Sequence, residues 1–164
     1  MEVMSTANPR LNTLGRYRII ADLGQGGMGD VYLAIASGPG GFSKLSVLKT
    51  LRQELESDSV EAFLDEARLC ARLNHPNVVQ TYEVFHDGQR HVLVMEYLDG
   101  QSLHHVLRRS STGLHPGPSL AMWLRLLVDA LEGLHYAHEL RDFNGSPLHL
   151  VHRDFSPHNV FVTF

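Results

Sequence analysis

The sequence has 164 residues, enough for one domain of ordinary size or for part of a larger one. With 43% hydrophobic and 20% charged residues it is a globular composition, and a net charge of −4 gives no reason to expect nucleic acid or an anionic membrane as a partner. The single cysteine, Cys70, excludes an internal disulfide framework and indicates a reducing compartment. We find no signal peptide in residues 1–14 and no apolar run near the roughly 20 residues that cross a bilayer. We therefore expect a cytoplasmic chain without a membrane segment.

The first half of the chain predicts a small antiparallel sheet with one helix. Residues 1–15 are polar and aperiodic, which indicates a flexible leader. The pattern predicts five strands, and a helix that begins at Asp58, keeps apolar residues at helical spacing and ends before His75. The strands are expected at residues 17–23, 31–36, 44–51, 78–85 and 91–97, with a turn at 86–88 between the last two.

Beyond Asp99 the pattern becomes helical. We expect a short helix at 102–109, a linker at 110–118 and a long helix at 119–140, followed by a polar loop at 141–147. Along one face the long helix carries Leu120, Trp123, Leu124, Leu127, Leu131 and Leu134. The sequence thus predicts an α+β chain whose sheet-rich part covers residues 16–98 and whose helical part covers 99–164.

A polar stretch, His152–Asn159, lies between two apolar runs at 148–151 and 160–162. Such runs predict short buried strands, which would pin the polar residues on a loop. Asp154 and Asn159 could there serve phosphoryl transfer, since a carboxylate accepts a hydroxyl proton and an amide oxygen binds a metal ion. The alternative is a polar turn with an Arg–Asp pair.

Gly24, Gly26 and Gly29 form the pattern G-x-G-x-x-G, which several protein families use to approach phosphate groups closely. A dinucleotide-binding fold would need a helix to begin here, whereas residues 31–36 continue as a strand. A Walker A loop would need lysine at Asp30. The remaining alternative is a glycine-rich hairpin without a ligand.

Lys49 is the next informative residue, because strand alternation puts it on one face with Leu45, Val47 and Leu51. A lysine on a buried apolar face is costly unless an anion meets it, and Glu66 on the predicted helix is the expected partner. The alternative is an edge lysine whose ammonium reaches water, together with an exposed glutamate.

Together these pieces resemble the protein kinase family, most closely the bacterial serine/threonine kinases that look eukaryotic. Five sequence motifs occur in the order in which the family has them. The match covers residues 17–164, which is nearly the whole chain. The motifs are the glycine segment, Lys49 with Glu66, Asn74–Val79, Met95–Leu98 and His152–Asn159.

The resemblance implies a site for ATP and Mg²⁺ and a protein substrate with a serine or threonine hydroxyl. It implies that Lys49 holds phosphates and is oriented by Glu66, that Asp154 accepts the hydroxyl proton, and that Asn159 binds magnesium. Met95 would be the gatekeeper residue, and Arg153 would pair with a phosphorylated activation segment. The residues implied to contact the nucleotide are Leu23, Gly24, Gln25, Gly26, Gly27, Met28, Gly29, Asp30, Val31, Lys49, Glu96 and Leu98.

Several departures from the family pattern affect these expectations. Val47 stands where the family usually has a smaller alanine, and Phe161 where it usually has leucine, so both would narrow the adenine pocket. Ser156 replaces a lysine that would lie near the γ-phosphate, and this makes the class of acceptor hydroxyl less secure. An Asp-Phe-Gly motif is expected roughly a dozen residues beyond Asn159, and the sequence stops at Phe164. We therefore expect this chain alone to be inactive and to self-associate through the apolar face of residues 119–140. The alternative function is a non-catalytic nucleotide-binding or interaction module.

Histidines also raise the possibility of zinc. His135 and His138 lie three residues apart with Glu139 beside them, but the H-E-x-x-H pattern would need histidine at Asp142. Zinc is therefore disfavoured, and this leaves the abundance of histidine unexplained.

Overall fold

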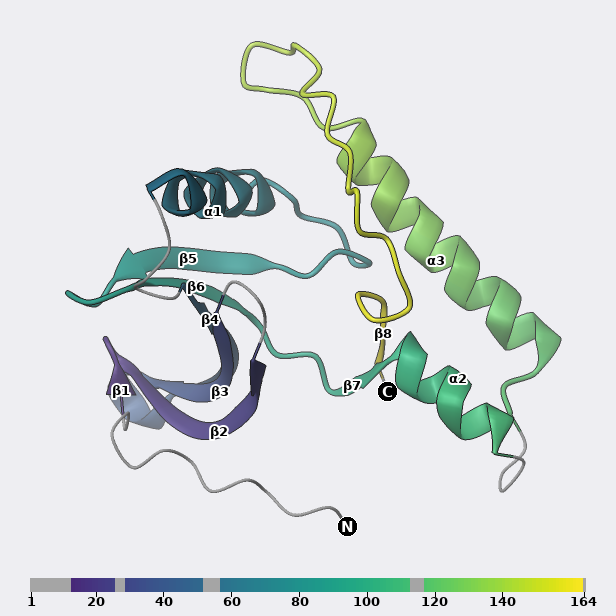
Figure 1. Ribbon diagram of the computed structural model, residues 1–164, viewed down its shortest axis with the longest axis horizontal. Helices are drawn as coiled ribbons and strands as arrows, with labels where there is room; N and C mark the ends of the chain where they lie inside the picture. The colour runs from purple at the N-terminus through teal and green to yellow at the C-terminus, as the bar shows by residue number, and fades with distance from the viewer. Residues whose placement is uncertain (1–12, 26–28, 52–56, 113–116, 164) are drawn as a thin grey trace. The chain divides into compact units, whose positions relative to one another are not determined.

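The structure is a computed structural model that describes residues 13–25, 29–51, 57–112 and 117–163 (Figure 1). The chain forms two compact units. The first, which we call the sheet unit, contains the described residues up to Arg72 together with Gln80–Tyr97. The second, the helical unit, contains Leu73–Val79 and the described residues from Leu98 onward. Leu73–Val79, expected before the boundary, thus clusters with the second unit.

The sheet unit is built on a six-stranded antiparallel sheet with the strand order β1-β2-β3-β4-β6-β5. Its strands are β1 (Thr13–Leu14), β2 (Tyr17–Gln25), β3 (Asp30–Ser37), β4 (Ser43–Thr50), β5 (Thr81–His86) and β6 (His91–Glu96). The five predicted strands are confirmed within a few residues, and the turn between β5 and β6 is held by Asp87, whose carboxylate accepts the N–H groups of Gln89 and Arg90. Figure 1 shows the strands of this unit curling into a strongly twisted sheet.

The leader prediction is wrong for residues 13–15. Thr13 and Leu14 form β1, which folds back on β2 through a tight turn in which Gly15 adopts a φ of +53°. Leu14 is only 1% exposed, so the burial of this one apolar side chain offsets the entropy of ordering the segment.

Two hydrophobic clusters fill the sheet unit. One lies on the face of the sheet that carries Leu48, Val92 and Val94, each fully buried. The other lies beneath helix α1 (Ser57–Cys70), which buries Phe63 and Ala67 against Leu51 and Leu93. The four-residue spacing of Phe63 and Ala67 is the helical period that the sequence showed, and it explains which side of α1 meets the sheet.

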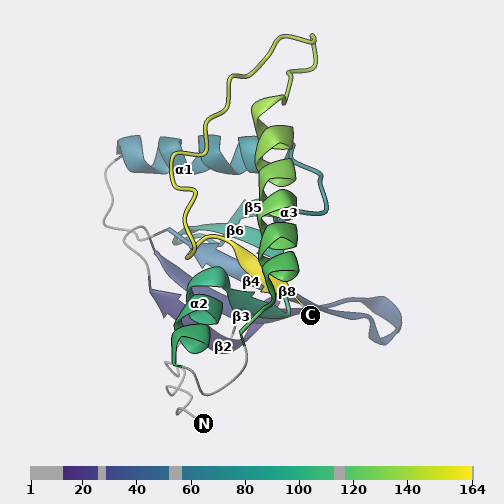
Figure 2. The ribbon, with the colours of Figure 1, turned by 90° about the vertical axis from the view of Figure 1, so that its right-hand side faces the viewer.

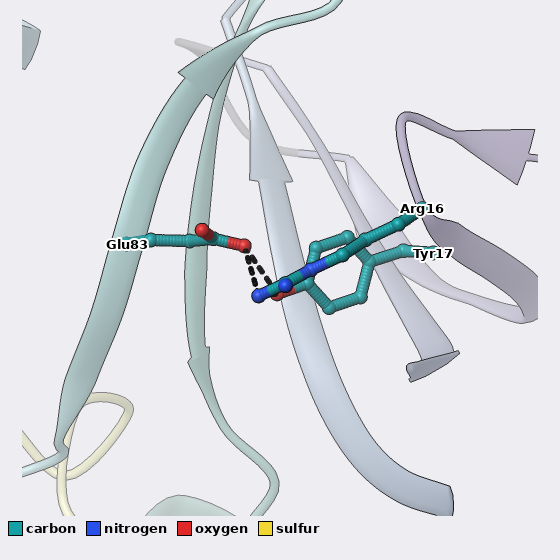
Figure 3. Close-up of polar contacts among 3 residues, drawn as sticks. All are labelled: Arg16, Tyr17 and Glu83. Carbon is teal, nitrogen blue, oxygen red and sulfur yellow. Dashed lines mark hydrogen bonds and ion pairs between the residues drawn. The ribbon is translucent and has the colours of Figure 1, made fainter. Parts of the chain in front are cut away.

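A polar contact links two strands of this sheet that are not hydrogen-bonded to each other. The guanidinium of Arg16 and the hydroxyl of Tyr17 both donate to the carboxylate of Glu83 on β5, the former at 3.0 Å (Figure 3). The Tyr17 ring is 3% exposed and stacks on Phe85 with a centroid separation of 5.9 Å. Burial, followed by the hydrogen bond to Glu83, raises the pKa of the Tyr17 phenol. The contact therefore ties β2 to β5, two strands that are not neighbours in the sheet.

The helical unit contains α2 (Leu103–Ser111), α3 (Leu120–His138) and a two-stranded sheet of β7 (Gly100–Ser102) and β8 (Phe161–Thr163). Each helix begins after a serine whose side chain accepts a backbone N–H of the first turn, Ser102 for α2 and Ser119 for α3. Beyond α3 the chain turns at residues 141–147 and returns alongside the helix, as both views show (Figures 1 and 2). In the part of the chain that the structure describes, no helix is long and apolar enough to cross a membrane.

Two predictions for this unit are wrong. The apolar run at 148–151 is not a strand, and Val151 is 65% exposed. The run at 160–162 does contribute to strand β8, but its partner β7 comes from residues 100–102, where we expected no strand and the start of a helix at residue 102. A three-residue strand carries too little periodicity to be recognised from its own sequence, because its pairing is decided by a distant segment.

Candidate active site

The glycine-rich segment joins β2 to β3, as predicted. Its first part still belongs to β2, which has a register shift between Asp22 and Gly24. Gly24 has a φ of +147° and donates its N–H to the Asp22 carboxylate at 2.9 Å. Leu23 is half exposed, and Gln25 ends β2 opposite Asp30. Gly26, Gly27 and Met28 lie outside the described residues.

The end of the segment is fixed to β4. Gly29 is buried, and a Cβ at this position would lie 1.5 Å from the backbone oxygen of Thr50, so only glycine fits. The Thr50 hydroxyl donates to the Asp30 oxygen at 3.2 Å. Val31 is the register partner of Lys49. The packing thus places the glycine segment and Lys49 on neighbouring strands.

Lys49 and Glu66 meet in the sheet unit, with 3.4 Å between Nζ and Oε1. The expected environment of Lys49 is wrong in one respect: the fully buried face of β4 carries Ser46, Leu48 and Thr50, and Lys49 lies on the opposite, more open face. Its side chain is 27% exposed and that of Glu66 is 48% exposed. An ion pair this accessible contributes at most about 1 kcal/mol to the free energy of folding. Stability alone therefore does not explain why Lys49 and Glu66 are paired next to the glycine-rich segment.

Cys70 follows Glu66 by one helical turn. Burial, and then the charge of Glu66, raise the pKa of its thiol, so this cysteine is a poor nucleophile. Its half-buried sulfur acts here as a small apolar group.

Glu96 ends β6 and is held by Gln80 in two ways. Its carboxylate accepts the Gln80 N–H at 2.6 Å, and its own N–H donates to the Gln80 oxygen at 2.9 Å. Met95 packs against the cluster beneath α1. Leu98, the other predicted adenine contact in this stretch, is half-buried and begins the second segment of the helical unit. Sequence reasoning missed Gln80, because a glutamine at a strand entrance carries no motif.

Asp154 and Asn159 are brought together in the helical unit. The Asn159 amide donates to the Asp154 backbone oxygen at 3.0 Å and to its carboxylate Oδ2 at 2.7 Å. Arg153, which lies between His152 and Asp154 in the sequence, adopts a φ of +60°, an unusual conformation for a residue with a side chain. The Asp154 N–H donates back to His152, whose oxygen is 2.8 Å away. With its N–H groups used in this way, Asn159 keeps its amide oxygen as a potential metal ligand, and Asp154 keeps Oδ1 as a potential proton acceptor.

This loop is anchored to the start of α2. Leu103 and His104 donate their backbone N–H groups to Val160 and Pro157, at 2.7 and 2.8 Å. Next to these bonds β7 pairs with β8, and at Gly100 a Cβ would lie 2.1 Å from the Val162 oxygen. This anchor was not predicted from the sequence, although the glycine after Asp99 is a signal of close backbone approach.

Comparison with known proteins agrees with this arrangement. The model of the family described as protein kinase domain matches residues 17–163. The chain is 41% identical over 158 residues to the tyrosine-protein kinase MasK of Myxococcus xanthus, covering 95% of this chain and 24% of that protein. It is 34% identical over 151 residues to the serine/threonine-protein kinase pkn2 of the same species, covering 91% of this chain and 16% of that protein.

Solved structures give the same result. The crystal structure of the Mycobacterium tuberculosis PknI kinase domain matches with a TM-score of 0.67 and 28% identity, over 92% of this chain and 55% of that one. The chain belongs to the protein kinase family, and its fold is protein-kinase-like. It spans about a quarter or less of the length of the two curated relatives named above, and just over half of the solved domain.

Proposed function

We propose that this chain carries the nucleotide-binding and catalytic-loop residues of a protein kinase that transfers the γ-phosphoryl group of Mg-ATP to a serine or threonine hydroxyl of a protein. The observation that carries the proposal is the hydrogen bond of 2.7 Å between Asn159 and Asp154. It aligns an amide oxygen and a free carboxylate oxygen on one loop, as a metal ligand beside a proton acceptor requires.

The residues present fit the nucleotide. Lys49 offers an ammonium on the open face of β4, Glu66 fixes its position, and Gly24, with no atom within 4 Å of its Cβ position, leaves open space in which a phosphate could approach the backbone. Asn159 would hold Mg²⁺, which supplies neutralisation of phosphate charge when bound. Asp154 would orient the acceptor hydroxyl and take its proton.

A test with the full-length protein compares Lys49→Met and Asp154→Asn with the unaltered protein. Lys49→Met should weaken ATP binding about 10- to 100-fold, the loss of one charge-assisted phosphate contact. Asp154→Asn should leave ATP binding intact and slow transfer about 10²- to 10⁴-fold. Lys44→Met on the exposed part of the same strand and Asp65→Asn on the surface of α1 are the matched controls. Equal ATP affinity of Lys49→Met and Lys44→Met would contradict the assigned role of Lys49.

Tyrosine is the second candidate acceptor, because the 41% identical relative is named a tyrosine-protein kinase. Ser156, in the position where the family usually has lysine, is consistent with either hydroxyl. Phosphoamino-acid analysis of a modified substrate separates the two. ATP binding without transfer to any acceptor would favour a non-catalytic binding module.

We further propose a cytoplasmic location, on the basis of the single cysteine, and contact between copies of the 164-residue chain through the apolar face of α3. On its own this chain should transfer no phosphate, because Asn159 is neutral and does not supply the negative charge that fixes magnesium between phosphates. Transfer by the 164-residue polypeptide, lost in Asp154→Asn, would contradict this.

A further inference from the structure

Helix α2 carries basic side chains and no acidic one. Its sequence LHHVLRRSS contains His104, His105, Arg108 and Arg109. Residues four apart share a helix face, so His104 lies next to Arg108 and His105 next to Arg109. His105 and both arginines are exposed, and among the described residues no carboxylate pairs with either arginine.

This basic surface continues onto the catalytic loop. The rings of His104 and His158 stack with centroids 4.1 Å apart and an angle of 20° between their planes. His105 lies beside them, with its ring 5.9 Å from that of His104. The backbone bond from His104 to Pro157 fixes the same junction. His158 is the residue before Asn159 and four residues after Asp154, so the basic surface borders the proposed reaction centre.

The charged groups around His104 at this junction are mostly positive. The pKa of His104 is lowered first by His158, then by burial, and then by His105 and Arg108. Three of these four causes are repulsion between positive charges. In the described stretches at 98–112 and 148–163 only two carboxylates occur, Asp99 and Asp154, against three arginines. Asp154 is the group that would face the acceptor hydroxyl.

We propose that His104, His105, Arg108, Arg109 and His158, which we call the α2 basic surface, select protein substrates with an anionic side chain close to the acceptor hydroxyl. The inference rests on the proposed function and adds a substrate class to it. Guanidinium and imidazole N–H groups are donors that suit planar or tetrahedral oxyanions. A neutral imidazole still has one N–H, so the surface retains donors at neutral pH. The anion is either the carboxylate of aspartate or glutamate or the phosphate of a residue modified earlier, and the two share this chemistry.

Kinetics of the full-length protein test the selection. Peptides with one acceptor hydroxyl are flanked by aspartate and glutamate, by phosphoserine, by alanine or by lysine. We expect KM for at least one anionic set to be about fivefold below that for the alanine set, because an exposed ion pair contributes up to about that factor. Arg108→Gln combined with His105→Gln should remove the difference and leave kcat for the alanine peptide unchanged. Arg125→Gln combined with His86→Gln, which changes the same residue types elsewhere, should keep it. The same KM for all sets, or a lower KM for the lysine set, would overturn the proposal.

A binding measurement separates this inference from the proposed function. The same peptides, with alanine in place of the hydroxyl, are titrated by fluorescence anisotropy against the protein and against Arg108→Glu. Tighter binding of the anionic peptides, together with a preference of Arg108→Glu for the lysine peptide, supports the role of the α2 basic surface. This holds even if no peptide is phosphorylated, and in that case only the kinase proposal fails. Phosphorylation of every peptide set with no preference in either measurement would leave the kinase proposal standing and overturn the substrate class.

Discussion

The sheet unit and the helical unit bury apolar surface very differently. All the fully buried hydrophobic side chains among the described residues, including Leu48, Phe63 and Val92, lie in the sheet unit. In α3 the only buried residue is Gly133. The apolar stripe of that helix stays open: Leu120, Leu124, Leu127, Val128 and Leu131 are each between 48% and 74% exposed.

The difference shows that an apolar pattern along a helix can indicate either a buried face or an exposed one. In α1 the pattern identifies the side that meets the sheet, whereas in α3 it identifies a side that nothing in the described residues covers. An exposed apolar stripe along a helix of 19 residues is a surface that associates with another apolar surface. The sheet unit should therefore be stable by itself, and the stability of α3 should depend on what meets the stripe.

The largest contrast is expected from matched leucine truncations. Leu48→Ala removes a side chain with no exposed surface and should destabilise the sheet unit by about 3 kcal/mol. Leu127→Ala, at a position 53% exposed, should change stability by less than about 0.5 kcal/mol. Hydrogen exchange measured by mass spectrometry assigns each effect to its unit. Equal costs would mean that the stripe of α3 is covered in solution.

A smaller effect is expected where α3 does pack closely. A Cβ at Gly133 would lie 2.6 Å from the backbone oxygen of Asn77, within the helical unit. Alanine normally stabilises a helix interior relative to glycine by about 1 kcal/mol. At this position we expect the opposite sign, a loss of about 1–2 kcal/mol, with faster exchange in both α3 and residues 73–79. A gain in stability would show that this contact yields easily.

In the sheet unit, Tyr17→Phe removes the hydroxyl that donates to Glu83 and should cost about 1 kcal/mol. The change should also alter the response to alkali. The folded state raises the pKa of Tyr17, so the stability gained from the neutral phenol is complete below the unfolded value of about 10 and is lost as the pH rises through the folded value. Thermal melts of the parent should fall in this alkaline range more steeply than those of Tyr17→Phe. Parallel curves would contradict the assignment.

The smallest change in folding free energy is expected for charged substitutions in the apolar stripe of α3, which should nevertheless strongly reduce self-association of the chain. Leu127→Glu with Leu131→Glu interrupts the stripe at two exposed positions and should alter stability by less than about 0.5 kcal/mol. Sedimentation velocity of the 164-residue chain should show less self-association. Met122→Glu, 56% exposed and off the stripe, is the control on the same helix. An unchanged sedimentation profile would remove the stripe as the contact.

The sequence predicted the fold where local pattern and burial agree. Strand alternation, the glycine turn and the helical spacing of Phe63 and Ala67 identified most of the sheet unit, because each is a property of neighbouring residues. The predictions were wrong where a distant partner decides the outcome. Thr13 and Leu14 are ordered by β2, and β7 exists because residues 161–163 return to it.

The candidate site shows the same division. Motif spacing singled out Lys49, Glu66, Asp154 and Asn159, and the two pairs that they form are present. The face of β4 on which Lys49 lies was misjudged, because alternation tells which residues share a face without telling which face is buried. The supports provided by Gln80 and by the junction of His104 with Pro157 depend on hydrogen bonds of backbone groups to residues far along the chain, which leave no trace in the sequence.

The pairing of β7 with β8 has a consequence for the order in which the chain acquires structure during synthesis. Ser102 and Phe161 are register partners about 60 positions apart, so closing this pair carries the entropic cost of a long loop. The sheet unit, by contrast, has its last strand, β6, complete at Glu96. It can fold as the ribosome releases it, whereas the loop of Asp154 and Asn159 lacks its anchors at Pro157, Val160 and β8 until these residues have emerged. A nascent chain paused before that point would hold Lys49 and Glu66 in place and leave the Asp154 carboxylate unpositioned, so the two groups of residues proposed for the site would become ordered at different times.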